Sequence, residues 1–600
     1  MKKIFSVFFI LISGIGYTQN LLPILERPIT IAATHENIPS VLNRIGQAGG
    51  FSFSYNSAII NPEETITLNV INQPVRFVLN EIFGNTMTFK VKSNYLILTK
   101  APPPPVKKNT VVIVINGYVQ DAETQEKVAQ VSIYDKNSLV SATTDEYGYF
   151  NLKLEKKVDS LSINVSKRNY QDTVFTITIA ENQYLNISIR PERLDSAILL
   201  QPNQPTDSAV TLPKEEFVLP YESEPNIQNI RDTLYELVQV SFLPFLGTNG
   251  RLSGNVINDY SINLLGGYSL GTRQIELGFF FNIDRGDVQW LQIAGFGNLV
   301  GGKVYGVQAS GFFNLNGGTT QAVQLTGFAN TNLDDLKGVQ VAGFANTNLG
   351  SVRGVQVAGF TNFTREESQG VQVAGFGNMQ IGDYVGSQFA GLTNFTTETI
   401  SGSQVSAIFN YGGHVRGTQI GLINYADSLG GVPIGLLSIV KSGYHKIELS
   451  ADEVFYTNLA FRSGVRKFHT MLMAGFKPQQ SLAPSDTSVW TFGYGLGTAR
   501  KLTRWWYLDL DLSSQHINKG SFTDDLSLLN KFYVGFDFQV APKFSIALGA
   551  TLNGYLTRTT YNDYPELFTD YQPKIFVDEN LNHDINLKMW LGGKLALRFL

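Results

Sequence analysis

The feature that most constrains this chain is a repeat of sixteen residues that runs from residue 290 to about residue 439. Its clearest copies read GVQVAGFANTN (338–348), GVQVAGFTNFT (354–364) and GVQVAGFGNMQ (370–380). One glutamine recurs at every sixteenth residue from Gln292 to Gln404, and one asparagine does so from Asn298 to Asn410. A short, fixed period indicates one strand-sized unit used many times. A row of like groups also argues against catalysis, which needs a few unlike groups at one point.

Two architectures fit the repeat. In the first, each repeat is one strand of a β-barrel wall, neighbours run antiparallel, and residues 235–600 supply roughly twenty strands. This arrangement is favoured by the flanks, because Ser261–Leu270 and Arg273–Ile283 read as an ordinary hairpin that leads into the first repeat. We therefore expect the repeats to belong to the barrel.

The alternative is a parallel β-solenoid attached to a smaller barrel, in which each repeat is one coil and identical residues stack. The strict period favours it, because a coil must keep a constant cross-section whereas barrel loops vary in length. The side chains expected to fill the coil interior are Val352, Val355, Val357 and Phe360.

Residues 441–600 predict the strands of an outer-membrane β-barrel. Phe532, Val534 and Phe536 alternate with Tyr533, Gly535 and Asp537. The last strand places Leu587, Met589, Leu591, Leu595, Leu597 and Phe599 on one face and Lys588, Trp590, Lys594 and Arg598 on the other. A long apolar face opposite a polar one is typical of strands that cross lipid around a polar lumen. Aromatic residues near strand ends fit an interfacial belt: Trp490, Trp505, Trp506 and Tyr507. The final Leu597-Arg598-Phe599-Leu600 resembles the terminal aromatic signal of outer-membrane barrels, with the aromatic shifted by one residue.

The N-terminus predicts export. Residues 1–20 begin with Lys2 and Lys3, continue with an apolar run to Ile15 and offer a cleavage region at residues 16–19, which is typical of a signal peptide. The chain has no cysteine, which excludes disulfides, thiol chemistry and a lipid-anchored cysteine. Its sequence holds no apolar run of about 18 residues, as a transmembrane helix would need. We expect an exported protein that is either soluble or a β-barrel.

Residues 24–100 predict a small α+β domain with the element order β-α-β-β-α-β-β. The order, with VLNRIGQAGGFSFSYN (41–56) and VRFVLNEIFG (75–84), resembles the short N-terminal (STN) domain of secretins and TonB-dependent signalling receptors. That resemblance implies a periplasmic domain that has no active site. It would dock a partner protein, such as an anti-sigma-type regulator or a TonB-system component. A purely structural domain is the alternative.

A proline-rich linker at residues 101–109 separates this domain from a β-sandwich at residues 110–193, for which about seven short strands are predicted. The phrases NGYVQDAETQEKVAQVSIYD (116–135) and TTDEYGYFNL (143–152) resemble the carboxypeptidase-regulatory-like domain, which carries no peptidase chemistry. Arg168-Asn169-Tyr170 departs from the family, which usually has glycine before the tyrosine. Four acidic residues fit either a calcium site or solvated turns, and we favour the turns: Asp121, Glu123, Asp145 and Glu146. Residues 194–233, which are polar and rich in proline, predict a second linker.

The sequence predicts no catalytic, cofactor-binding or metal-ligating residue and no cofactor. The six histidines fall in unrelated segments: His35, His414, His445, His469, His516 and His583. We interpret the repeated Gln and Asn as structural, and Lys588, Lys594 and Arg598 as lumenal residues that either attract anions or hydrate the wall. A formal charge of −4 gives no electrostatic case for nucleic acid.

The fold class expected is therefore multidomain and mainly β. An α+β domain and a β-sandwich precede a repeat region (234–440) and barrel strands (441–600), which sit in outer-membrane lipid. The expected function is non-enzymatic: envelope signalling, docking or solute passage by an outer-membrane protein of Bacteroidetes type with periplasmic N-terminal domains. The alternative is a surface-exposed solenoid that binds a partner and is anchored by a small barrel. The second linker is too short for the plug domain of TonB-dependent transporters, so energised uptake is not expected.

Overall fold

The computed structural model describes residues 22–84, 86–101, 112–154, 160–178, 181–192, 218–477, 488–559, 567–568 and 572–600. The signal segment predicted at residues 1–20 lies outside these residues, as do most of the first linker and residues 193–217. The chain forms two compact units, one of residues 1–131, 142–163 and 174–191, the other of residues 132–141, 164–173 and 192–600. In the described parts of the chain, no helix is long and apolar enough to cross a membrane.

The N-terminal module is the predicted α+β domain. Its elements are β1 (Pro28–Asn37), α1 (Ile38–Gly49), β2 (Ser52–Tyr55), β3 (Thr65–Pro74), α2 (Val75–Phe83), β4 (Met87–Lys92) and β5 (Tyr95–Lys100). Asn37 caps α1, because its Oδ1 accepts the backbone N–H of Ser40 at 3.0 Å. Strand β1 pairs with β3, and β2, β5 and β4 form a second sheet. Val41, Ile45, Val78 and Leu79 are fully buried in the core.

The next module is the predicted β-sandwich. One sheet has the order β12 (Gln183–Ile189), β6 (Ile113–Asp121), β9 (Tyr149–Leu154). The other has the order β11 (Thr173–Thr178), β10 (Ser160–Ser166), β7 (Ser132–Tyr134), β8 (Ser141–Thr143). Gly148 has a φ of +73°, and a Cβ there would lie 2.9 Å from the carbonyl oxygen of Val119. This turn therefore requires glycine.

The two N-terminal modules meet around one buried carboxylate, within the first unit. Glu26, only 7% exposed, accepts hydrogen bonds from the Tyr118 hydroxyl at 2.7 Å and from Nη2 of Arg76 at 2.6 Å. The Arg76 guanidinium lies 4.5 Å from the ring centroid of Tyr149. Burial and the bond to Glu26 raise the pKa of Tyr118. These charge-assisted contacts hold the α+β domain against the sandwich.

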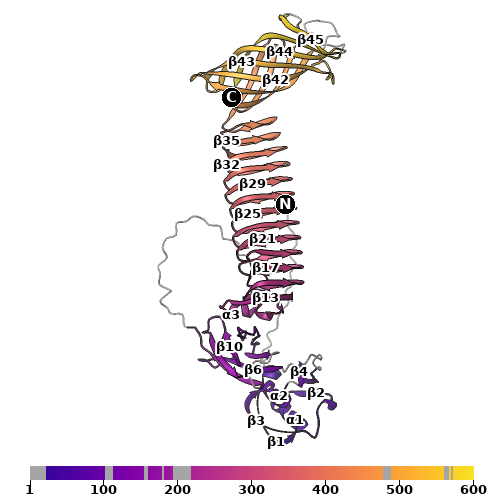
Figure 1. Ribbon diagram of the computed structural model, residues 1–600, viewed down its shortest axis with the longest axis vertical. Helices are drawn as coiled ribbons and strands as arrows, with labels where there is room; N and C mark the ends of the chain where they lie inside the picture. The colour runs from indigo at the N-terminus through magenta and orange to yellow at the C-terminus, as the bar shows by residue number, and fades with distance from the viewer. Residues whose placement is uncertain are drawn as a thin grey trace, which may run out of the picture. The chain divides into compact units, whose positions relative to one another are not determined.

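The repeats form a parallel β-solenoid, which appears in Figure 1 as the ladder of strands between β13 and β35. Its longer strands are β13 (Leu234–Leu243), β15 (Val256–Asn263), β17 (Gly271–Gly278), β19 (Leu291–Ala294), β21 (Val304–Ser310), β23 (Thr320–Thr326), β25 (Leu336–Ala342), β27 (Val352–Ala358), β29 (Ser368–Ala374), β31 (Tyr384–Ala390) and β32 (Thr393–Ser406), followed by β34 (Thr418–Ile420) and β36 (Pro433–Ile434). The alternating strands are β14 (Leu246–Gly247), β16 (Gly266–Ser269), β18 (Phe281–Asp284), β20 (Gly297–Val300), β22 (Phe313–Asn316), β24 (Ala329–Asn332), β26 (Ala345–Asn348), β28 (Thr361–Thr364), β30 (Gly377–Gln380), β33 (Phe409–Val415), β35 (Ile423–Leu429) and β37 (Leu437–Val440).

Identical residues of successive coils lie side by side, as Gln340 and Gln356 do in the parallel pair β25–β27. The alternative architecture is therefore the correct one, and the expectation that the repeats form barrel wall is wrong. The predicted hairpin at residues 261–283 is also absent, because β15 and β17 pair in parallel, with Tyr260 beside Ile275. Coils repeat without reversing direction, so an antiparallel wall cannot form.

The coil interior differs from the one expected, in which four apolar side chains would lie inside. Val352 is buried, but Val355 and Val357 are only half-buried and Phe360 is 39% exposed. The interior instead holds amides and small side chains, with Gln356, Ala358 and Asn362 at most 4% exposed. The phenylalanines at this position from Phe296 to Phe376 stack outside on each other, as Phe344 and Phe360 do at 4.9 Å between ring centroids.

Two continuous amide ladders join the coils. In the asparagine ladder Nδ2 donates to Oδ1 of the following coil, as from Asn346 to Asn362 at 2.9 Å. In the glutamine ladder Nε2 donates to Oε1 of the preceding coil, as from Gln372 to Gln356 at 2.8 Å. Buried amides are costly unless they are hydrogen-bonded, and between Gln292 and Asn410 identical neighbours at a strand spacing of about 4.8 Å bond to them. This requirement explains why the glutamine and the asparagine recur in successive coils, including the last ones, where the spacing shortens to 15 and 14 residues.

The end of the predicted second linker packs on the first coils. Residues 218–233 contain α3 (Pro225–Asn229), and Ile227 and Leu219 join a buried cluster with Tyr268 and Ile283. This segment covers apolar side chains that have no preceding coil, as capping segments of repeat proteins do.

The C-terminal strands close into a barrel of eight strands, separate from the repeats. They are β38 (Tyr444–Asp452), β39 (Thr457–Val465), β40 (Phe468–Lys477), β41 (Val489–Lys501), β42 (Trp506–Lys519), β43 (Ser527–Ala541), β44 (Phe544–Arg558) and β46 (Ile585–Phe599). All neighbours are antiparallel, and β46 closes the ring by pairing with β38. An additional strand, β45 (Ile575–Asn582), pairs with the first part of β46.

The predicted alternation of faces on the barrel strands is confirmed. Leu591, Leu595 and Phe599 are exposed on the outside, at 42–68%. Trp590 and Arg598 of the same strand are fully buried on the inside. The barrel is therefore apolar outside and charged inside.

The two rims of the barrel differ in the length of their connections. At the rim where the chain enters at β38 and ends at Leu600, the turns are residues 466–467, 502–505 and 542–543. At the opposite rim the connections are residues 453–456, 478–488, 520–526 and 559–574. The solenoid joins the rim with short turns, near which the hydroxyl of Ser463 donates to the carbonyl of Ser438.

Candidate functional site

The barrel interior is occupied by a network of ion pairs. Arg462 binds Asp511 through two parallel bonds, Nη1–Oδ1 at 3.0 Å and Nη2–Oδ2 at 2.5 Å. Glu448 accepts from Nε of Arg462 at 2.6 Å and from Nε of Arg598 at 2.8 Å. Bidentate pairs of this kind are geometrically specific. The residues come from four different strands, so the network ties opposite walls of the barrel together.

Further groups complete the network. Lys594 contacts Glu448 at 2.5 Å, Arg598 contacts Asp537 at 3.0 Å and also pairs with Asp509, and Nε2 of His469 lies 2.8 Å from Nη1 of Arg462. These side chains are almost fully buried. The cavity that remains among them measures about 30 Å³, which is the volume of about one water molecule in the liquid. Among the described residues, these ion-paired side chains fill this part of the barrel interior.

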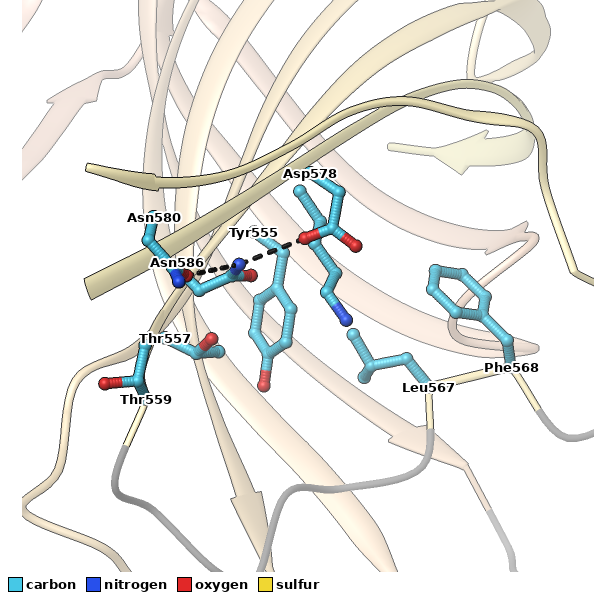
Figure 2. A pocket seen from close by; sticks show the side chains of 9 residues that line it. Tyr555, Thr557, Thr559, Leu567, Phe568, Asp578, Asn580 and Asn586 are labelled. Carbon is cyan, nitrogen blue, oxygen red and sulfur yellow. Dashed lines mark hydrogen bonds between the residues drawn. The ribbon is translucent and has the colours of Figure 1, made fainter. Parts of the chain in front are cut away.

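A larger hollow of about 340 Å³ opens at the opposite end of the barrel, near the rim with long connections. Figure 2 shows Tyr555 and Thr557 from β44, Asp578 and Asn580 from β45, and Asn586 from β46 around it. Nδ2 of Asn586 donates to Asp578 and to Asn580, both at 3.0 Å. Lys588, Leu567 and Phe568 complete the lining. The described lining includes one carboxylate, one ammonium group and two apolar side chains, which can bind a small polar molecule.

The structure places the lumenal cations in two different settings. Arg598 and Lys594 lie inside the network, where neighbouring carboxylates already neutralise them. Lys588 lines the rim hollow and remains half-buried. Of the three cationic residues predicted to face the lumen, only Lys588 is therefore open to an anion.

The repeated Gln and Asn are structural, as interpreted from the sequence, because their amides are buried and bonded to each other. The six histidines do not converge in the structure. His469 is in the barrel network, and His414 contacts Ser428 on the solenoid at 2.9 Å.

The acidic residues considered for calcium act in turns. Oδ1 of Asp121 accepts the backbone N–H groups of Glu123 and Thr124 at 2.7 and 3.0 Å. Oδ1 of Asp145 accepts those of Tyr147 and Tyr149, both at 3.0 Å. These are Asx-type turns, in which the side chain replaces a backbone acceptor. In the described parts of the chain, no group of three or more His, Cys, Asp or Glu is placed to hold a metal ion.

Sequence reasoning missed the charged network. The signal was present in β42, where Asp509 and Asp511 alternate with Leu508, Leu510 and Leu512. Carboxylates on the buried inner face of a barrel strand need buried cations. The partners lie 49 and 89 residues away in sequence, at Arg462 and Arg598, and only barrel closure brings them together.

Comparison with known proteins identifies one segment. No curated protein matches the chain. Residues 115–199 match the family described as the CarboxypepD_reg-like domain, and the described part of this range is the β-sandwich of strands β6 to β12. The matched range excludes the solenoid and the barrel, so the match bears on the β-sandwich module alone.

Proposed function

We propose that the protein is a non-enzymatic outer-membrane protein whose small barrel is an anchor and whose solenoid is a stalk for docking domains. The observation that carries this proposal is the packed barrel. Its outer face is apolar and its lumen is filled by Arg462, Arg598 and their carboxylate partners. A barrel that is apolar outside suits lipid, and a filled lumen disfavours solute passage.

The connections at the two rims support a periplasmic stalk. Outer-membrane barrels have short turns on the periplasmic side and longer loops outside the cell. The chain enters from the solenoid at the rim with short turns. On this assignment the solenoid and both N-terminal modules lie in the periplasm, and the rim hollow around Asp578 and Lys588 faces the exterior.

The stalk would extend the docking modules from the membrane. Its longer strands, β13 to β36, form thirteen rungs, and twelve spacings of about 4.8 Å give a length of about 58 Å. The N-terminal module, which resembles the STN domain, would dock a periplasmic anti-sigma-type regulator or a TonB-system component. The contacts of Glu26 with Tyr118 and Arg76 would hold it on the sandwich while it does so.

The absence of cysteine from the sequence makes a topology test direct, because single cysteines carry no background. We expect Ser521→Cys, in a long connection, to react with an impermeant maleimide on intact cells. Glu398→Cys, an exposed residue of the solenoid, should react only after the outer membrane is permeabilised. Labelling of Glu398→Cys on intact cells would instead establish the surface-exposed solenoid.

The anchor is tested separately by conductance. Purified protein in planar bilayers should give no stepwise current, because the buried ion pairs of Arg462 and Arg598 fill the lumen between the described strands. Regular unitary currents from the wild-type protein would contradict the anchor and restore solute passage.

A further inference from the structure

Trp290 stands at a coil position where the backbone has a positive φ, which favours glycine. It occupies the position that is glycine in six later coils, at residues 306, 338, 354, 370, 386 and 402, where φ lies between +99° and +152°. Trp290 itself has a φ of +66°. Positive φ is strained for a bulky residue, and strain of this kind clusters at functional sites.

The strained backbone at Trp290 does not place its indole against another aromatic ring of the described residues. Two other aromatic residues of the same unit with positive φ, Tyr221 and Phe245, pack on Tyr268 with centroids 5.3 and 5.2 Å away. Trp290 makes no such ring contact with any described residue and is 75% exposed, more than any other large apolar side chain in the described ranges. An aromatic plane held out into solvent at a conformational cost is a feature that binding would explain.

The indole borders a hollow of about 670 Å³ that is lined by Asp287, Gln289, Tyr305, Gly306 and Val307. Gly306 lies beside Trp290 in the next coil, where Val307 donates its backbone N–H to the carbonyl of Trp290 at 2.6 Å. Because Gly306 has no side chain, nothing at that position of the next coil covers the space beside the indole.

The polar groups of the hollow are available to a ligand. Within the described residues, neither the Gln289 amide nor the Tyr305 hydroxyl bonds to another residue. Asp287 uses Oδ1 to accept the backbone N–H of Lys303 at 2.8 Å. The lining therefore offers one aromatic face, one amide, one hydroxyl and one carboxylate, and it contains no basic side chain.

We propose that Trp290 and its neighbours form a carbohydrate-binding site for a pyranose-containing glycan. A pyranose ring with equatorial hydroxyls has a flat C–H face that packs on an aromatic plane, while its hydroxyls bond to planar amide and carboxylate groups such as those of Gln289 and Asp287. A nucleic-acid base also stacks on tryptophan, but a site without a cation and with one carboxylate repels phosphate. This proposal goes beyond the anchoring role and does not depend on which side of the membrane the solenoid occupies.

The test uses the full-length protein in an amine-oxide detergent, which carries no sugar. Chitohexaose and cellohexaose are titrated by calorimetry and by tryptophan fluorescence. Saturable binding of either supports the site, and a preference for chitohexaose or for cellohexaose assigns the source to an N-acetylated or to a plain hexose glycan. Failure of both to bind at millimolar concentration overturns the proposal.

Trp290→Gly is the decisive variant, because it installs the residue that the six later coils carry at this position. We expect at least about a tenfold loss of affinity, the usual effect of removing an aromatic stacking platform, with an unchanged or higher melting temperature. Trp505→Ala, which removes an exposed indole of the barrel, is the matched control and should bind as wild type. Gln289→Ala, a second variant, should weaken binding by about threefold to tenfold through a lost hydrogen bond. Wild-type affinity in both Trp290→Gly and Gln289→Ala would rule out the site.

Discussion

Nε2 of Gln292 donates to Oδ2 of Asp284 at 2.7 Å and to Oε2 of Glu276 at 2.9 Å, so the glutamine ladder begins on two buried carboxyl groups. Both carboxyl groups are fully buried. Burial, followed by the neighbouring Glu276, raises the pKa of Asp284 well above its ordinary value. Asp284 therefore keeps its proton to a higher pH in the folded protein than in the unfolded chain.

Asp284→Asn should stabilise the solenoid at neutral pH. A raised carboxyl pKa gives stability that is complete below the unfolded pKa and is lost as pH rises through the folded pKa. The asparagine needs no proton and resembles Asn316, which bonds to Gln308 in a later coil. We expect a gain of about 1–3 kcal/mol in unfolding free energy.

Denaturant titrations between pH 4 and pH 9 measure this effect. The denaturant concentration at the unfolding midpoint of the wild-type protein should fall as pH rises. The midpoint of the variant should fall less. Glu398→Gln, an exposed carboxylate of the same solenoid, is the control and should leave the profile unchanged. Equal pH slopes for Asp284→Asn and wild type would show that Asp284 is not protonated in the folded state.

Asn362→Ala should interrupt the asparagine ladder. Asn362 accepts from Asn346 at 2.9 Å and donates to Asn378 at 2.8 Å. Its removal leaves one buried donor and one buried acceptor without partners, at about 1–3 kcal/mol each. Thermal unfolding followed by circular dichroism gives the loss. Thr347→Ala, on the outer face, is the control, and an equal loss in both variants would argue against the ladder.

Arg598→Met should destabilise the barrel strongly. It leaves Glu448, Asp509 and Asp537 short of a buried cation, and breaking a buried pair costs about 3–5 kcal/mol. Arg558→Met removes an exposed partner of Asp525 and should cost less than about 1 kcal/mol. The temperature at which the folded band disappears on unheated gels compares the two. Similar temperatures would mean that the inner network adds little stability.

Leu595→Arg should impair insertion of the barrel. Leu595 is 52% exposed on the outer wall, and an arginine facing the middle of the bilayer costs about 2–4 kcal/mol. Leu325→Arg places the same charge at a similarly exposed apolar residue of the solenoid, outside the proposed span. Fractionation should find less Leu595→Arg protein in the outer membrane and unchanged Leu325→Arg protein. Equal depletion of both variants would contradict the separate roles of the two parts.

The barrel strands were predictable because one face of each must meet a different environment from the other. Leu595 and Arg598 show this difference in the sequence itself. The arrangement of the repeats could not be predicted in this way. Residues such as Gln356 and Phe360 recur every sixteen positions whether the repeats form a barrel wall or a solenoid. The distinguishing fact is that Gln356 and Asn362 need identical partners in neighbouring coils, whereas a barrel wall tolerates variation. The charged network depends on contacts between residues as distant as Arg598 and Glu448, which no local pattern shows.

The amide ladders have a consequence for how such a chain changes its size. Each coil contacts only its neighbours, and every coil presents the same glutamine and asparagine to the next. Excision of residues 338–353 would therefore place Asn330 beside Asn362 and Gln324 beside Gln356, so that both amide ladders continue. Duplication of a coil does the reverse. The length of the solenoid can thus change during evolution in steps of one strand spacing, about 4.8 Å, without any new contact having to evolve.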